Sequence, residues 1–207
     1  MRLPLLLISL SFHEWAHAWS AWRLGDDTAE RMGRLTLNPF VHADILGTYV
    51  MPLIAPFGWA KPVPVNPARF RRGVKMSTGM MLTASAGPLS NFFLATVSAV
   101  IFGLLVRFAP GILEPGHGVS FLLTQMIKLN VVLGIFNLVP LPPLDGSRIV
   151  DGLVPLRLRP AWDQFSRVAP FILLALLFIP GSPLLRLLAG PMSLVITGLQ
   201  HLVNVIV

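Results

Sequence analysis

Long stretches without charged side chains dominate the pattern of hydrophobic and polar positions along this chain. Residues 76–106 contain no charged residue, and residues 118–140 contain only Lys128. A helix needs about 20 mainly apolar residues to cross a hydrocarbon layer of roughly 30 Å. Both stretches therefore predict membrane-spanning helices.

The two ends of the chain predict further spans. The first 22 residues are mainly apolar, although three ionisable side chains lie in the second half of this stretch. Residues 168–207 contain a single charge, but breaks with proline and glycine at 180–183 and 190–191 interrupt them. Proline cannot continue a regular helix, so we expect two short spans in this region.

Segment 45–60 is too short for an ordinary span and contains two prolines and two glycines. Irregular backbone is tolerated at membrane depth where it is buried against protein or lines a watery cavity. We therefore expect a re-entrant or hairpin segment here. The whole chain is predicted to be an all-α polytopic membrane protein with about five transmembrane helices.

Composition agrees with this fold class and excludes several others. Of the 207 residues, 54% are hydrophobic and 12% are charged, whereas soluble domains contain roughly a quarter charged residues. A disordered tail and a nucleic-acid-binding domain of the usual kind are therefore excluded, and we expect the lipid bilayer, with no nucleic acid, as a partner. The chain has no cysteine, which excludes thiol catalysis and cysteine-ligated zinc.

Basic residues indicate the orientation of the chain, because Lys and Arg collect in cytoplasmic loops. Twelve of the 16 fall in residues 23–75 and 148–167, and both regions lie on one face if segment 45–60 does not cross. We expect an integral, multi-pass protein of the cell membrane with this face in the cytoplasm. The twelve are Arg23, Arg31, Arg34, Lys61, Arg69, Arg71, Arg72, Lys75, Arg148, Arg157, Arg159 and Arg167.

The first predicted span contains a His-Glu-x-x-His pattern at residues 13–17. On a helix, His13 and His17 lie about 40° apart in projection and one turn along, so both imidazoles can hold one metal ion. Glu14 projects beside them, where it can take a proton from metal-bound water. The alternative, three polar residues in a packed helix, costs a few kcal/mol for each unpaired ionisable group inside a membrane.

A catalytic zinc site usually has three protein ligands, so one more His, Asp or Glu is required. Asp145 is the first choice because it follows a predicted span directly, after three prolines at 140–143 that end the helix. A helix-capping role is the ordinary alternative for this aspartate. Asp44 with His42 is the second choice, and His117 and His201 are more simply read as satisfied polar residues.

Two of these segments, HEWAH at 13–17 and NLVPLPPLDG at 137–146, resemble the paired signatures of the site-2 protease family, the intramembrane zinc metalloproteases. Similar segments follow the same order as in that family: GRLTLNPFVHADILGT at 33–48, GWAKPVPVNP at 58–67 and AGPLSNFFLA at 86–95. The resemblance covers roughly residues 10–150.

The resemblance implies a zinc metalloendopeptidase that cleaves transmembrane protein substrates, as in regulated intramembrane proteolysis. His13, His17 and Asp145 would bind Zn²⁺, and Glu14 would be the general base for attack by zinc-activated water. Asn137 would position substrate or stabilise the oxyanion. These expectations make residues 1–207 a single membrane-embedded metalloprotease domain, with a catalytic core of about 1–150 and C-terminal helices at about 166–207.

Some readings stay open from the sequence. Asn91 is expected to line the site, but a helix-to-helix hydrogen bond explains a buried Asn equally well. Lys128, with Gln125 and Asn130, could line the cavity too, although snorkelling and interhelical bonding are more ordinary roles. A zinc enzyme acting on a lipid or prenylated chain end, and a metal transporter or scaffold, are the competing functions. A transport site would not need Glu14 as a base.

Overall fold

A computed structural model describes residues 2–54, 58–114, 117–179 and 181–207, and within these ranges the chain forms helices and no strand. The four longest helices after the first are α5 (Met76–Phe108), α6 (Val119–Asn137), α8 (Arg159–Phe178) and α9 (Pro183–Ile206). Short helical turns are Pro67–Arg69, Pro110–Leu113 and Leu156–Leu158.

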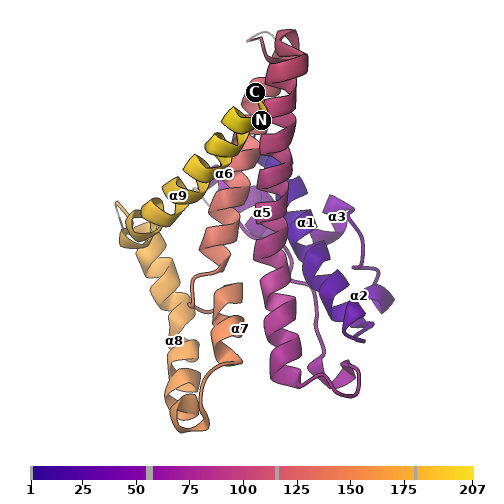
Figure 1. The fold of residues 1–207 in the computed structure, drawn as a ribbon. Helices are drawn as coiled ribbons and strands as arrows, with labels where there is room; N and C mark the ends of the chain where they lie inside the picture. The colour runs from indigo at the N-terminus through magenta and orange to yellow at the C-terminus, as the bar shows by residue number, and fades with distance from the viewer. Residues whose placement is uncertain (1, 55–57, 115–116, 180) are drawn as a thin grey trace.

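Helix α5 lies at the centre of the fold and packs against α1 (Arg2–Arg23), α6, α9 and the short α7 (Asp145–Asp151). Figure 1 shows α1 on one side of α5 and α6 to α9 on the other. Small residues let neighbouring helices approach closely. The buried face of α5 is rich in them: Gly79, Ala84, Gly87, Ser90, Ala95, Ser98, Ala99 and Gly103.

Among the residues that the structure describes, four segments are long and apolar enough to cross a membrane: α5, α6, Leu156–Phe178, which contains α8, and α9. The chain is therefore an all-helical protein with the segments of a multi-pass membrane protein. Five spans were expected, and the difference is α1. This helix has 22 residues as expected, but it is not among the four, because polar and charged side chains interrupt its second half.

The C-terminal helices differ from the expected boundaries. Helix α8 begins at Arg159 instead of near 168, and it carries the charged residues Asp163 and Arg167 in its first half. Helix α9 continues through Gly190 and Pro191, where a break was expected. One proline removes one backbone hydrogen bond, and spanning helices tolerate this. The break at 180–183 falls between the two helices, and position 180 lies outside the described residues.

The chain turns back on itself within segment 45–60. It forms a π-helical turn at Ile45–Val50 and then α4 (Met51–Ile54). The Trp59 N–H donates to the Gly47 carbonyl at 3.0 Å, and the Thr48 hydroxyl donates to the Trp59 carbonyl at 2.8 Å. The two ends of the segment are therefore in contact. Its residues 55–57 lie outside the described ranges, and the re-entrant position in the membrane stays a prediction.

Residues 60–66, which we call the strap, run without helix or strand beside α1. Polar groups hold this extended chain at both ends. The Lys61 N–H donates to the His42 carbonyl at 2.8 Å, and Arg34 donates to the carbonyls of Lys61 and Pro62 at 3.1 Å each. At the other end, the Asn66 N–H donates to the buried Asp26 carboxylate at 2.6 Å.

Two further short helices connect α1 to the strap, α2 (Thr28–Arg31) and α3 (Pro39–His42). The Asp27 carboxylate pairs with Arg31 and Arg69, which joins α2 to the turn after the strap. Partial burial raises the Asp27 pKa, but the bonds and charges of Arg31 and Arg69 together outweigh this effect and hold that pKa below its usual range. The region 23–75 is therefore a folded layer against α1 and α5.

Candidate metal centre

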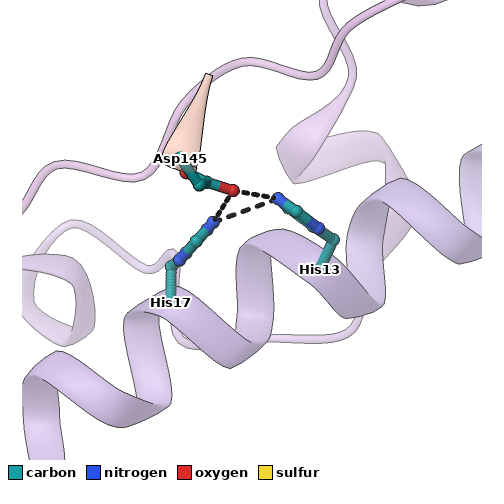
Figure 2. Close-up of side chains that lie close together, drawn as sticks. All are labelled: His13, His17 and Asp145. Carbon is teal, nitrogen blue, oxygen red and sulfur yellow. Dashed lines mark hydrogen bonds and ion pairs between the residues drawn. The ribbon is translucent and has the colours of Figure 1, made fainter. Parts of the chain in front are cut away.

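His13, His17 and Asp145 lie together, as Figure 2 shows. The His13 and His17 Nε2 atoms are 3.0 Å apart. Asp145 Oδ2 lies 3.0 Å from His13 Nε2 and 3.2 Å from His17 Nε2. All three residues are buried, with at most 9% of each exposed. They form the one group of His, Cys, Asp and Glu suited to a metal among the residues that the structure describes.

The directions of the hydrogen bonds show that this triangle suits a cation. His17 Nδ1 is 2.7 Å from the Thr83 carbonyl oxygen, which can only accept, so Nδ1 carries the proton. His13 Nδ1 donates to Asn91 Oδ1 at 2.6 Å. With Nδ1 used in these bonds, both rings direct Nε2 at Asp145 Oδ2, which has no hydrogen-bond partner. Two imidazole nitrogens and a carboxylate oxygen that converge in this way are donors that a metal ion can bind together.

The spacing fits zinc. Zinc binds His nitrogen and carboxylate oxygen at about 2.0–2.2 Å in tetrahedral geometry, which separates neighbouring ligand atoms by about 3.3 Å. The three separations of 3.0–3.2 Å are close to that value. Two imidazoles and one carboxylate leave the fourth position open, as in catalytic zinc sites.

Helix α5 comes unusually close to the two histidines at Gly87. A Cβ atom at this position would overlap the imidazoles of both His13 and His17, and it would lie 2.6 Å from His13 Cε1. Glycine is therefore the residue that lets α5 back the metal ligands. Pro88, Thr83 and Asn91 surround this position on the same buried face of α5.

Asp145 comes from a distant part of the chain. Helix α6 ends at Asn137, the turn with the three prolines follows, and α7 begins at Asp145 itself. The residue before α7 is Leu144, so Asp145 does not act as its N-cap, and its side chain reaches the histidines instead. A Cβ on Gly146 would lie 2.5 Å from the Val139 carbonyl oxygen and closer still to Leu138, so glycine permits this tight approach.

Glu14 is not among the three ligands, as expected for a general base. Its Oε2 atom accepts the backbone N–H of Val63 in the strap at 2.9 Å. The Val63 side chain is buried with Ala18 of α1 and Ala29 of α2. The strap therefore fixes the position of one carboxylate oxygen of Glu14 beside α1, the helix that also carries His13 and His17. The catalytic role of Glu14 stays a prediction.

The two asparagines lie in different surroundings. Asn91 is fully buried and bonds both His13 and Asn130, so it supports a ligand and also makes the helix-to-helix bond that was its alternative role. Asn137 donates to the Leu133 carbonyl of its own helix at 3.0 Å. Its second amide N–H stays available, and its role toward substrate remains a prediction.

Asp44 and His42, the second choice of metal ligands, form hydrogen bonds with other groups. The Asp44 carboxylate accepts the Gly47 N–H at 2.7 Å and so caps the π-helical turn. His42 Nε2 donates to the Thr36 carbonyl at 2.7 Å. Neither these two residues nor His117 and His201 belong to the metal-suited group in the described part of the chain.

Sequence reasoning missed several supporting groups. No sequence pattern marks the Thr83 backbone carbonyl, since every residue has a backbone carbonyl. Gly87 lies within the AGPLSN segment, but the pattern did not show which glycine meets the histidines. Val63 was part of the proline-rich stretch without any indication that its N–H binds Glu14. Asn130 was named as a possible cavity residue, but the sequence did not show that it bonds Asn91.

The fold and site define a class: a multi-pass helical membrane protein with a buried metal centre of two histidines and one aspartate. The profile of Peptidase family M50 matches residues 111–180, which include Asp145. The chain is 42% identical over 175 residues to the "Putative zinc metalloprotease YwhC" of Bacillus subtilis, covering 84% of this chain and 78% of that protein. This chain belongs to peptidase family M50.

Two further relatives match at lower identity. The "Putative zinc metalloprotease Rip2" of Mycolicibacterium smegmatis is 30% identical over 141 residues, with 68% of this chain and 52% of that protein covered. A "Putative zinc metalloprotease" of Thermotoga maritima is 29% identical over 155 residues, with 72% and 31% covered. No solved structure matches the chain. Family membership and the buried cluster together make this protein a metalloprotease, and zinc is the metal that its donor set fits.

Proposed function

We propose that this protein hydrolyses peptide bonds of transmembrane protein substrates within the bilayer, in regulated intramembrane proteolysis. The observation that carries the proposal is the position of the metal centre along α5, a candidate span. At 1.5 Å per residue, the contact points Thr83 and Asn91 lie about 10 Å and about 22 Å from the start of α5. The ligands therefore contact this helix well inside its length.

The position also bears on how water reaches the site. The start of α5 follows the basic region 23–75, and the end of α6 leads into the basic region 148–167. If these regions are cytoplasmic, as the positive-inside rule indicates, the site lies nearer the cytoplasmic side of the cell membrane. A short path for water from that side supports a hydrolase inside the bilayer.

The chemistry divides between the metal and the chain. When bound, zinc lowers the pKa of water to about 7 and polarises a carbonyl group. His13, His17 and Asp145 would hold it. Glu14 would accept a proton from the attacking water as the new C–O bond forms. It would then return that proton to the amine as the C–N bond breaks, so that no proton is gained or lost.

The remaining polar groups would handle the substrate. The second N–H of the Asn137 amide is suited to the negative charge that develops on the carbonyl oxygen. A helical substrate must unwind locally before attack, because its backbone is hydrogen-bonded. The extended strap beside Glu14 is the element that could pair with an unwound segment by strand addition.

A cleavage assay with a matched control tests this proposal. Wild type, Glu14→Gln and Glu30→Gln are reconstituted in liposomes with a single-span helical peptide, and zinc content is measured on each sample. Glu30 is the control because its carboxylate binds Trp22 at the surface of α2. We expect cleavage by wild type and Glu30→Gln, and zinc without cleavage in Glu14→Gln.

Two results would contradict the proposal. Undiminished cleavage by Glu14→Gln would remove Glu14 as the base. A zinc-loaded wild type that leaves the peptide intact but hydrolyses a lipid ester or a prenylated chain end would favour the competing substrate class.

A further inference from the structure

A chain of buried amides leads away from His13 through three helices. Asn91 of α5 accepts from His13 Nδ1 at 2.6 Å and donates through Nδ2 to Asn130 Oδ1 of α6 at 2.9 Å. Asn130 Nδ2 in turn lies 3.0 Å from the Ser9 hydroxyl of α1 and 2.9 Å from the Met126 carbonyl. The side chains of Ser9, Asn91 and Asn130 are completely buried.

The Met126 carbonyl fixes the direction of every bond in this chain. A carbonyl oxygen only accepts, so the Asn130 group that faces it must be the NH₂ end. Asn130 Oδ1 then faces Asn91 and must accept from the Asn91 NH₂ group. This leaves Asn91 Oδ1 to face His13, where it accepts the Nδ1–H.

The consequence for His13 is a defined ring orientation. With Nδ1 as the donor, the Nε2 lone pair is free to face the metal position between His17 and Asp145. The other histidine obtains the same arrangement from a backbone carbonyl, that of Thr83. His13 therefore depends on side chains where His17 depends on the backbone.

We propose that Asn130 is a positioning residue for zinc binding, which acts on His13 through Asn91. The inference rests on the metal centre of the proposed function and does not depend on the nature of the substrate. Asn130 contacts none of the three ligands in the interactions of the described residues, so a change there reaches the metal only through the amide chain. Partners that hold the second nitrogen of a metal-bound His typically change metal affinity 10–100-fold when they are removed.

Zinc affinity of the purified full chain measures this effect without any cleavage assay. Dissociation constants are obtained by competition with a chromophoric chelator in detergent. We expect Asn130→Leu to weaken zinc binding about tenfold, and Asn91→Leu to weaken it by about 10–100-fold. Asn130→Asp retains an oxygen that can accept from Asn91, so it should bind zinc more tightly than Asn130→Leu.

A control and a double variant separate positioning from general damage. Ser98→Ala removes another buried polar group of α5, whose hydroxyl donates to the Leu94 carbonyl away from the amide chain. It should bind zinc like wild type. Adding Asn130→Leu to Asn91→Leu should produce no further loss, because the path to His13 is already broken.

The tautomer of His13 provides a second readout, from ¹⁵N NMR of the histidine rings in metal-free protein. We expect the Nδ1–H form in wild type and a mixture of forms in Asn130→Leu. Zinc affinity of Asn130→Leu within twofold of wild type, with an unchanged His13 spectrum, would overturn the inference and leave the protease proposal intact. A wild type that binds no zinc would overturn both the inference and the metal centre.

Discussion

The Glu14 carboxylate accepts a hydrogen bond of 2.9 Å from the backbone N–H of Val63, 49 positions further along the chain. Glu14 lies between the two histidine ligands in sequence, whereas Val63 lies in the extended strap. The bond therefore connects the predicted general base to a segment that is held independently by Asp26 and Arg34. The position of the strap and the orientation of Glu14 depend on each other.

Removing the N–H of residue 63 tests this dependence. Val63→Pro keeps an apolar side chain of similar size, removes the donor to Glu14 and fixes the backbone φ of residue 63, an effect that the control below shares at its own position. A hydrogen bond to a charged group contributes about 1.5–3 kcal/mol, so kcat/KM for a cleaved peptide should fall about tenfold or more, with zinc content unchanged. Val65→Pro is the control, because the Val65 N–H makes no hydrogen bond among the described residues. Equal activity of the two variants would show that the bond does not orient Glu14.

The contact between α5 and the histidines leads to a second prediction. In Gly87→Ala the added methyl group would overlap both imidazoles, so the ligands must move apart and zinc stoichiometry should fall well below one per chain. Gly198→Ala is a matched control in a helix, since nothing lies within 4 Å of its added Cβ. Metal analysis after gel filtration checks both. Full zinc occupancy in Gly87→Ala would refute the close packing.

The anchor at Asp26 should control the mobility of the strap. This buried carboxylate accepts hydrogen bonds from the N–H groups of Thr28 and Asn66. The variant Asp26→Ala removes the acceptor of both bonds. We expect a loss of about 2 kcal/mol or more in stability, with faster hydrogen exchange across residues 58–67 and slower peptide cleavage. Glu30→Ala, which removes a surface bond to Trp22, should leave exchange in the strap unchanged. If the strap stays protected in Asp26→Ala, Asp26 is not its anchor.

Zinc should stabilise the folded chain in proportion to its affinity. A ligand that binds only the folded state contributes about 2.7 kcal/mol at a hundredfold excess over its dissociation constant. The thermal midpoint of wild type should therefore rise with zinc concentration and fall on addition of a chelator. Asp145→Asn should respond much less, whereas His117→Ala, changed at an exposed residue, should respond like wild type. A zinc-dependent shift of equal size in Asp145→Asn would exclude Asp145 as a ligand.

Much of the fold and of the candidate site follows from local sequence. Residues 76–106 and 118–140 predicted spans that α5 and α6 match closely, because an uncharged stretch of this length has few alternatives in a membrane protein. The spacing of His13 and His17 predicted that both side chains lie on the same face, since both residues belong to one helix. Asp145 was selected over Asp44 by the prolines that precede it, and the structure brings Asp145 to the histidines.

Other features depend on packing between distant segments, which a single sequence does not display. Helix α1 was expected as a fifth span, but its polar residues are directed to α5 and the strap, and its hydropathy is correspondingly low. Helix α8 begins earlier than expected because its charged first turns pair with each other and with Asp151. The link from Asn130 to His13 requires α1, α5 and α6 to meet at one level.

X-ray absorption at the zinc edge of the purified protein is the most direct test of the central claim, that His13, His17 and Asp145 hold one zinc ion. We expect a first shell of two imidazole nitrogens and one or two oxygens at about 2.0–2.2 Å, with one imidazole lost in His13→Ala. A shell without imidazole, or a spectrum that His13→Ala and Asp145→Asn leave unchanged, would contradict it.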